Sequence, residues 1–411
     1  MYMNMLKYLI ESDSSFSMFN KKTYWNLFPN IATRGRKAMT NLISSLFQEV
    51  VTQVATKLAG VESLSLTADG WSSRASVGHV TVTLHWIDED WSLASVCLGA
   101  PKFEEFTTSQ DISLRVKKML ASVGLTRDKI FVATIDRGSN YQKAFREVLD
   151  ITTTDCVCHV LNGIGLKACE MVTKVDALCR YAQDITFFFK RSNKTTFMLH
   201  QEQRNAGEKV CGLKAACPTR WNSKYKLLKR FVRCYPHIEK LARRIPDLQF
   251  LFGHANVLIE ELEDVMLVLK LISNPLAVLE SQEIPHAGDV LIIFASMYTN
   301  LQDHVREQET KAAHELRDEI RSLLRQNFPW QKLPEIWLKA VFFDPRFKDF
   351  RKLNITLIKN WEQLRNRTLK NIRSELSDVQ EKRLSPKNSG SWKLTTRRGC
   401  GQVVCHYCYY L

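Results

Sequence analysis

The most informative stretch of the sequence is Leu66-Thr67-Ala68-Asp69-Gly70-Trp71-Ser72-Ser73. In it, the apolar segment from Val61 to Ala68, which we expect to be a strand, ends in the carboxylate of Asp69. Gly70 is expected to supply a turn that exposes the Asp69 side chain. Residues 78–87 (GHVTVTLHWI) then alternate apolar and polar side chains, the period-two pattern of a half-buried strand. Residues 129–136 (KIFVATID) form a second short apolar run, and this run also ends in an aspartate, Asp136.

Asp69 and Asp136 therefore stand at the carboxyl ends of two predicted strands, which we expect to be neighbours in one mixed sheet. Two acids in that arrangement can converge on a divalent cation, Mg²⁺ or Mn²⁺, as in phosphoryl-transfer nucleases. A lone aspartate at a strand end more often caps the turn or helix that follows it. The occurrence of both acids in this order favours the metal-binding interpretation over capping.

Composition and charge narrow the range of functions that the chain could have. A chain of 411 residues suggests about two or three domains, and 45% hydrophobic residues are enough to build a sizeable core. Lysine and arginine outnumber aspartate and glutamate by 58 to 43, which gives a net charge of +15. This excess favours a polyanionic partner, most simply DNA, and predicts binding that weakens with salt.

Membrane insertion and export are not predicted. The longest apolar stretches, such as residues 265–272 and 290–297, are far shorter than a membrane span. The first ten residues lack the apolar core and cleavage site of a secretion signal. The eleven cysteines follow no disulfide framework pattern, so we expect reduced thiols in the cytosol or nucleus.

Residues 1–60 are predicted to be helical, since residues 38–58 carry apolar side chains at three- and four-residue spacing. A compact basic turn, Arg34-Gly35-Arg36-Lys37, precedes this helix. The turn is either a solvated helix start or a contact for DNA phosphates, through Arg34, Arg36 and Lys37.

Residues 61–170 have an α/β pattern and residues 171–377 an all-helical one. Strands are expected near 62–68, 78–87, 91–98 and 129–135, with a helix near 112–122. Helices are expected near 175–190, 225–243, 254–271, 290–303 and 310–326, with breaks at Asn274-Pro275, Ile284-Pro285 and Phe328-Pro329. Residues 378–411 are predicted to be an irregular tail with a linker at 385–391; its Cys400, Cys405, His406 and Cys408 are too few and too close to the end for a zinc knuckle.

Five stretches together resemble the hAT (hobo–Activator) superfamily of DNA transposases, in particular its domesticated zinc-finger-BED type. The resemblance covers about residues 25–350. The stretches are SLTADGWSS (65–73), VATIDRGSNYQKAF (132–145), CVCHVLN (156–162), CPTRWNSKYKLLKRF (217–231) and AVFFDPRFK (340–348).

The resemblance implies an RNase H-like mixed sheet, starting at about residue 61, that is interrupted by a large helical insertion and preceded by a helical segment. It implies a catalytic set of two aspartates, here Asp69 and Asp136, and a glutamate that hold two divalent metals. Cys156 and His159 match the family's C-x-x-H pair beside the site. Arg220 and Trp221 match its Arg-Trp pair, whose indole stacks on a flipped DNA base.

Each of these side chains also has a simpler interpretation. Trp221 could anchor the helix that follows it on the sheet. His159 could be a core histidine, or Cys156 and His159 could form half of a zinc site.

Three departures from the family bear on activity. The glutamate of the family's Glu-Arg-x-Phe-Ser stretch has no counterpart in this sequence. Arg137 stands where the family has Asn after the second acid, and its guanidinium can pair with Asp136 and compete with a metal. No Cys-x-x-Cys…His-x-His finger precedes the core.

These observations predict a transposase-derived nuclear protein that binds DNA or a protein partner and is catalytically inert. Family-type dimerisation is expected to be weakened, because the C-terminal dimerisation stretch is missing. The alternative is a different class of function, that of an active hAT-type transposase that cleaves and transfers DNA strands with Mg²⁺ or Mn²⁺. A truncated gene model is a third interpretation.

Overall fold

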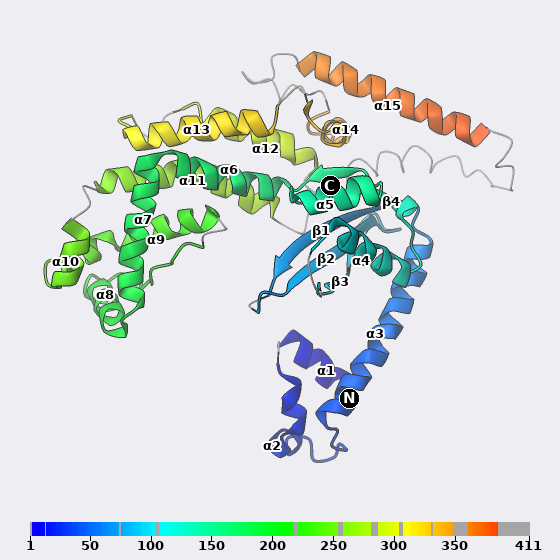
Figure 1. Cartoon of the computed structure of the whole chain (residues 1–411), viewed down its shortest axis with the longest axis horizontal. Helices are drawn as coiled ribbons and strands as arrows, with labels where there is room; N and C mark the ends of the chain where they lie inside the picture. Colours follow the sequence, from blue (N-terminus) through cyan, green and yellow to red (C-terminus); the bar gives the residue numbers. More distant parts are fainter. Residues whose placement is uncertain are drawn as a thin grey trace.

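The computed structural model describes residues 2–384, except residues 13, 74, 104–106, 218–220, 254–257, 281–286, 304–306, 330–331, 349 and 351–360. Three parts follow one another along the chain: a small N-terminal helical cluster, a sheet, and an elongated helical module (Figure 1). The predicted linker and the cysteines of the predicted tail lie outside the described residues.

The N-terminal cluster contains α1 (Tyr2–Glu11), η1 (Phe16–Asn20), α2 (Lys22–Trp25) and the start of α3 (Arg36–Ala59). Its small core is separate from the rest and includes Phe19, Trp25 and Met39. The indole Nε1 of Trp25 donates to the Phe19 carbonyl at 2.8 Å, so this buried ring has its polar atom satisfied. The α3 helix then connects the cluster to the sheet (Figure 1).

The sheet has five strands in the order β3-β2-β1-β4-β5. The strands are β1 (Leu64–Ser72), β2 (Gly78–Ile87), β3 (Leu93–Gly99), β4 (Ile130–Ile135) and β5 (Thr153–Asp155). The first three pair antiparallel, whereas β4 runs parallel to β1 and to β5. Val80, Val82, Leu84 and Trp86 of β2 are buried, as the alternating pattern predicts.

The turn predicted at Gly70 is wrong. Strand β1 continues through this position to Ser72, and Gly70 pairs with Val80 of β2. The glycine is needed for a different reason, because a Cβ at position 70 would lie 2.8 Å from Cζ of Tyr141. Close packing of an aromatic ring on the strand, rather than a turn, therefore accounts for this glycine.

Three helices complete the core of the sheet: α4 (Ser109–Ser122), α5 (Ser139–Lys143) and η3 (Ala144–Val148). A short turn of helix without buried residues, η2 (Arg127–Lys129), precedes β4. The hydroxyl of Thr108 accepts a hydrogen bond from the Asp111 N–H and so caps the start of α4. Ile112, Val116 and Leu120 of α4 are buried at helical spacing in the same core as the strands.

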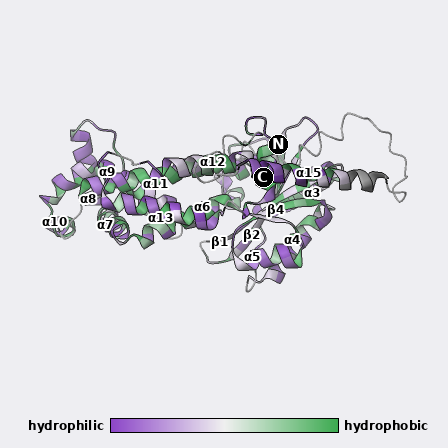
Figure 2. Ribbon diagram, turned by 90° about the horizontal axis from the view of Figure 1, so that it is seen from above, coloured by the Kyte–Doolittle hydropathy of each residue, from purple (hydrophilic) through white to green (hydrophobic). Residues whose placement is uncertain are grey.

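The helical module begins directly after β5. Its helices are α6 (Val157–Met171), α7 (Thr173–Lys190), α8 (Asn193–Asn205), α9 (Trp221–Ala242), α10 (Pro246–Gly253), α11 (Ile259–Leu279), α12 (Ala287–Asn300), α13 (Lys311–Asn327), α14 (Glu335–Phe343) and α15 (Trp361–Leu384). They share one continuous hydrophobic core, and hydrophilic and hydrophobic faces lie side by side along them (Figure 2). The last helix reaches Leu384, beyond residue 377 where the sequence predicts the helical segment to end.

The break predicted at Asn274-Pro275 is also wrong, because Pro275 lies inside α11. A proline in a helix interior costs about 3 kcal/mol or more. The apolar face of α11 offsets that cost, since Val265, Val268 and Ile272 are fully buried and full burial of one such side chain contributes about 1.5–3 kcal/mol. No helix among the described residues has the length and apolar character needed to cross a membrane.

Candidate functional site

The two aspartates singled out by the sequence lie at one edge of the sheet. Ala68 of β1 is in register with Ile135 of β4, and the two strands are parallel. Asp69, the next residue of β1, and Asp136, which directly follows β4, therefore lie at adjacent positions. Both line one cleft of about 1110 Å³.

The first turn of α6 brings His159 to this cleft, and Cys156 lies immediately before that turn. Cys156 precedes α6 and donates its N–H to the Ile135 carbonyl at 2.8 Å, which fixes the helix start beside the end of β4. One turn later, Nε2 of His159 lies 4.0 Å from Oδ1 of Asp69. The C-x-x-H pair is thus placed against the first acid.

The electrostatics of this group are strongly coupled. Burial raises the pKa of Asp69, and the negative charge of Asp136 adds to the increase, whereas His159 opposes it. Hydrogen bonds from Cys158 and then His159 lower the pKa of the Cys156 thiol. The bond to Cys156 raises the pKa of His159 to about 9. His159 therefore brings a positive charge to Asp69 at neutral pH.

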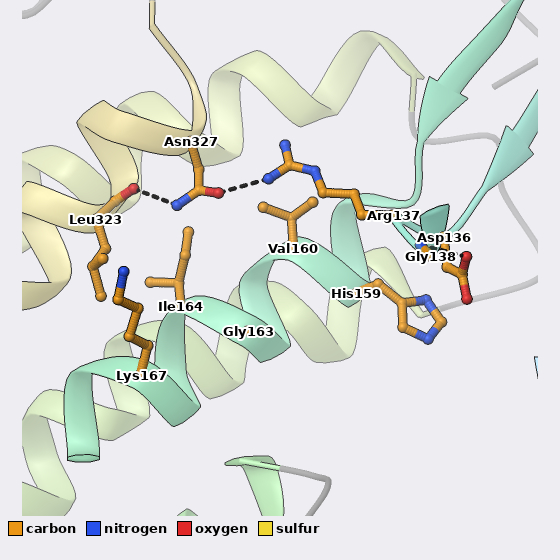
Figure 3. Close-up of a pocket in the computed structure, with 10 residues that line it drawn as sticks. All are labelled: Asp136, Arg137, Gly138, His159, Val160, Gly163, Ile164, Lys167, Leu323 and Asn327. Carbon is orange, nitrogen blue, oxygen red and sulfur yellow. Dashed lines mark hydrogen bonds between the residues drawn. The ribbon is translucent and has the colours of Figure 1, made fainter. Parts of the chain in front are cut away.

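Arg137 does not pair with Asp136, so the sequence-based expectation of competition with a metal is wrong. Its Nε donates to Oδ2 of Asp155 at 2.6 Å, and its Nη1 donates to Oδ1 of Asn327 at 2.6 Å. Figure 3 shows the guanidinium extending away from the Asp136 carboxylate. Oδ1 of Asp136 instead accepts the Gly138 N–H at 2.9 Å.

Arg137 consequently ties the sheet to the helical module. Asp155 ends β5 and Asn327 ends α13, so one guanidinium connects the loop after β4 to both. A second pocket of about 440 Å³ lies at this junction, where Lys167 of α6 is among the lining residues (Figure 3). The bridge fixes the helical wall relative to the acidic pair.

The acidic pair suits a hard divalent cation. Mg²⁺ prefers oxygen ligands and is commonly held by one or two carboxylates together with waters and substrate phosphates. A cation would also relieve the mutual repulsion of Asp69 and Asp136. Among the described residues, however, no three His, Cys, Asp or Glu side chains come together in an arrangement that could hold a metal.

The predicted nucleic-acid contacts form two groups, and the structure places the side chains of only one of them, the basic turn before α3. Arg220 lies outside the described residues; Trp221 is the first residue of α9, and its side chain is not described. Arg34 precedes α3, and Arg36 and Lys37 are in its first turn. That turn is separated from the sheet by the 24-residue α3 helix, a length of roughly 36 Å.

Sequence reasoning missed several residues that line the main cleft: Trp71, His79, Tyr141, Lys226 and Glu280. Trp71 was detectable, because side chains two residues apart on a strand share a face and Trp71 follows Asp69 at that spacing. Glu280 follows the end of α11 and reaches the cleft only through the packing of the helical module. No local pattern marks it.

Comparison with known proteins shows that this chain is similar to transposases. Residues 67–159 match the ZBED1 RNase-like domain. The chain is 25% identical over 240 residues to a putative AC transposase of Zea mays, covering 54% of this chain and 29% of that protein. It is 21% identical over 322 residues to the Hobo transposase of Drosophila melanogaster, covering 77% of this chain and 46% of that protein. The matched region spans less than half the length of either relative, and the predicted fold class, an RNase-like mixed sheet with a helical insertion, is confirmed.

Replacement of Arg137 by alanine should lower the free energy of unfolding, and the loss should be coupled to Asn327. In a double-mutant cycle with Asn327→Ala we expect a coupling energy of about 0.5–1 kcal/mol, because the bridge is partly exposed. The measurement is urea unfolding of the four proteins. Asn205→Ala, on the remote helix α8, should show no coupling to Arg137→Ala; equal coupling to both asparagines would contradict the bridge.

Replacement of Asp69 by asparagine should stabilise the metal-free protein at neutral pH. The folded-state pKa of Asp69 is raised, so ionisation of this carboxyl lowers the stability of the folded protein. The stability is complete only below the unfolded-state pKa, about 3.9, and falls as pH rises through the folded-state pKa. We expect Tm to rise by about 1–2 °C at pH 7 in chelator, a small gain because the side chain is 60% exposed. The gain should vanish as pH falls towards about 4.

The control for this substitution is Asp90→Asn in the exposed turn between β2 and β3, which should not change the Tm at neutral pH.

Added Mg²⁺ should raise the Tm of the unmodified protein but not that of Asp69→Asn, because only the former retains both carboxylates. A lower Tm for Asp69→Asn at neutral pH would contradict the electrostatic account.

Proposed function

We propose that this chain is a nuclear protein derived from a hAT-superfamily transposase, and that it binds DNA in the cleft shared by Asp69 and Asp136 without cutting it. The observation that carries the proposal is the placement of these two acids, in register on parallel neighbouring strands, in a cleft of about 1110 Å³. That cleft is large enough to admit part of a nucleic-acid strand.

An aromatic pair in the cleft supports nucleic acid as the ligand. The rings of Trp71 and His79 are stacked, with centroids 4.3 Å apart and planes 8° from parallel. Nε1 of Trp71 donates to Oγ1 of Thr81 at 2.9 Å, so the indole orientation is fixed while 44% of the residue remains exposed. A fixed, exposed indole can stack on an unpaired base, an interaction that contributes about 1–3 kcal/mol.

The basic turn before α3 supports a contact with the DNA backbone. Arg36 and Lys37 occupy the first turn of a helix that has no acidic residue there. Cations are unfavourable at that end, because the helix dipole is positive. Arg34 lies over the Tyr2 ring at 4.2 Å. An anionic ligand such as a phosphate would explain why Arg36 and Lys37 stand where the helix dipole disfavours them, with Arg34 beside them.

Asp69 and Asp136 would hold one Mg²⁺ or Mn²⁺, which would supply positive charge for binding a DNA phosphate. Two-metal cleavage needs ligands that keep two ions about 3.5–4 Å apart. Asp69 and Asp136 supply two carboxylates for this purpose. A missing third carboxylate should raise the barrier by several kcal/mol and slow cleavage by orders of magnitude.

One observation favours the second candidate, metal-dependent strand cleavage and transfer. Glu280 lines the same cleft as Asp69 and Asp136 and is close enough for its charge to raise the pKa of Cys158. Its side chain is exposed at the end of α11. An inward movement on DNA binding would let Glu280 act as the third carboxylate.

DNA binding should weaken steeply with salt, and the basic turn should account for part of that dependence. We expect the triple variant Arg34→Ala, Arg36→Ala, Lys37→Ala to flatten the plot of log K against log salt by about 0.9 for each phosphate that the protein no longer neutralises. The measurement is fluorescence anisotropy with duplex DNA from low to physiological salt.

A matched triple variant tests whether net charge alone explains the effect. Lys190→Ala, Arg191→Ala, Lys194→Ala removes the same charge from an exposed region of α7 and α8 and should leave the slope nearly unchanged. Binding by the unmodified protein that ignores salt would rule out a backbone contact.

The chain should not nick DNA. Incubation with Mg²⁺ or Mn²⁺ and a pre-unpaired flap substrate should give the same product level for the unmodified protein and for Asp69→Ala. Nicking above the Asp69→Ala level would overturn the inert proposal. Loss of that nicking in Glu280→Gln would assign the third carboxylate to Glu280 and establish the second candidate.

A further inference from the structure

The Tyr141 ring is buried against the strand that carries the first acid. Tyr141 lies on α5 and is 7% exposed. A Cβ at position 70 would come within 2.9 Å of its Cε2 and closer still to its hydroxyl oxygen. The ring therefore occupies the space that the missing Gly70 side chain leaves beside Asp69.

The hydroxyl of this buried tyrosine has no hydrogen-bond partner among the described residues. Tyr141 lines the cleft together with both acids. Burial, followed by the charges of Asp136 and Asp69, raises the pKa of Tyr141, so the phenol stays protonated and remains a donor. A buried phenol normally finds a partner, and leaving one unsatisfied costs about 1–3 kcal/mol.

Both flanks of Tyr141 are held in place. Asn140 Nδ2 donates to the Thr107 carbonyl at 2.6 Å, and Gln142 Nε2 donates to the Asp136 carbonyl at 2.7 Å. The first bond fixes α5 to the segment before α4, and the second fixes it to Asp136. The direction of the Tyr141 hydroxyl is therefore set before any ligand arrives.

Ring packing alone does not explain the oxygen atom. Phenylalanine would fill the same space on Gly70 and would leave no unsatisfied donor in a buried position. A ligand that brings an acceptor to the acidic pair would satisfy the hydroxyl. A phosphodiester is such a ligand, because a cation held by Asp69 and Asp136 attracts a phosphate and its non-bridging oxygens accept hydrogen bonds.

We propose that the Tyr141 hydroxyl donates a hydrogen bond to a non-bridging oxygen of the DNA phosphate that binds at Asp69 and Asp136. This inference rests on the proposed DNA-binding function and adds a specific contact to it. Tyr141 is thus a substrate-binding residue that orients one phosphate relative to the acidic pair.

The test is fluorescence anisotropy of a pre-unpaired flap DNA in Ca²⁺ with the unmodified chain and with Tyr141→Phe. The variant keeps the ring, so its Tm should be unchanged or higher, and its affinity should be roughly tenfold lower because it loses a hydrogen bond to a charged acceptor. Tyr181→Phe, which alters a buried tyrosine of α7 in the helical module, should bind like the unmodified protein.

Replacing the phosphates of the flap by methylphosphonate, one position at a time, identifies the phosphate that accepts the hydrogen bond from Tyr141. One position should weaken binding by the unmodified protein and have a much smaller effect on Tyr141→Phe. Weaker binding by Tyr141→Phe without such a position would overturn the phosphate assignment, because the hydroxyl would then contact a base or a metal-bound water. Equal binding by both proteins would overturn the inference and leave DNA binding intact; no binding by either would refute both proposals.

Discussion

The parallel pairing of β1 with β4 is the interaction on which the site depends. Its register places Ala68 opposite Ile135, so the residue after each of them is an aspartate at the same edge of the sheet. A one-residue slip would turn one carboxylate to the opposite face. The buried side chains of Leu66, Val132 and Ile135 prevent that slip, because it would expose them to water.

Two like charges on neighbouring strands, Asp69 within β1 and Asp136 just after β4, create an electrostatic cost that the surrounding side chains partly offset. His159 brings a positive charge to Asp69 and is kept protonated by Cys156. Arg137, the cation nearest to Asp136 in sequence, is used elsewhere, in the bridge from Asp155 to Asn327. The acids are thus left partly uncompensated, as a site for a cation and a phosphate would require.

The sequence predicted the strands well where local patterns are strong, and the residues of β2 match the alternating run in full. It failed at Gly70 and at Pro275, where a general rule about glycine turns and proline breaks was outweighed by tertiary packing. It also missed β5, a three-residue strand too short to show a period. Arg137 was assigned to the wrong acid, because distance along the chain does not determine which partner a long side chain reaches.

The sequence by itself determined the α/β-then-helical order and the similarity to transposases, and it singled out the two aspartates, since strand periodicity and acids that follow apolar runs are local features of the chain. Only the tertiary structure decided what surrounds those aspartates. Glu280 and Asn327 reach the acidic edge from helices far along the chain, and Tyr141 meets Gly70 across two elements. Such contacts depend on how helices pack on a sheet, and packing is set by the whole core rather than by any one segment.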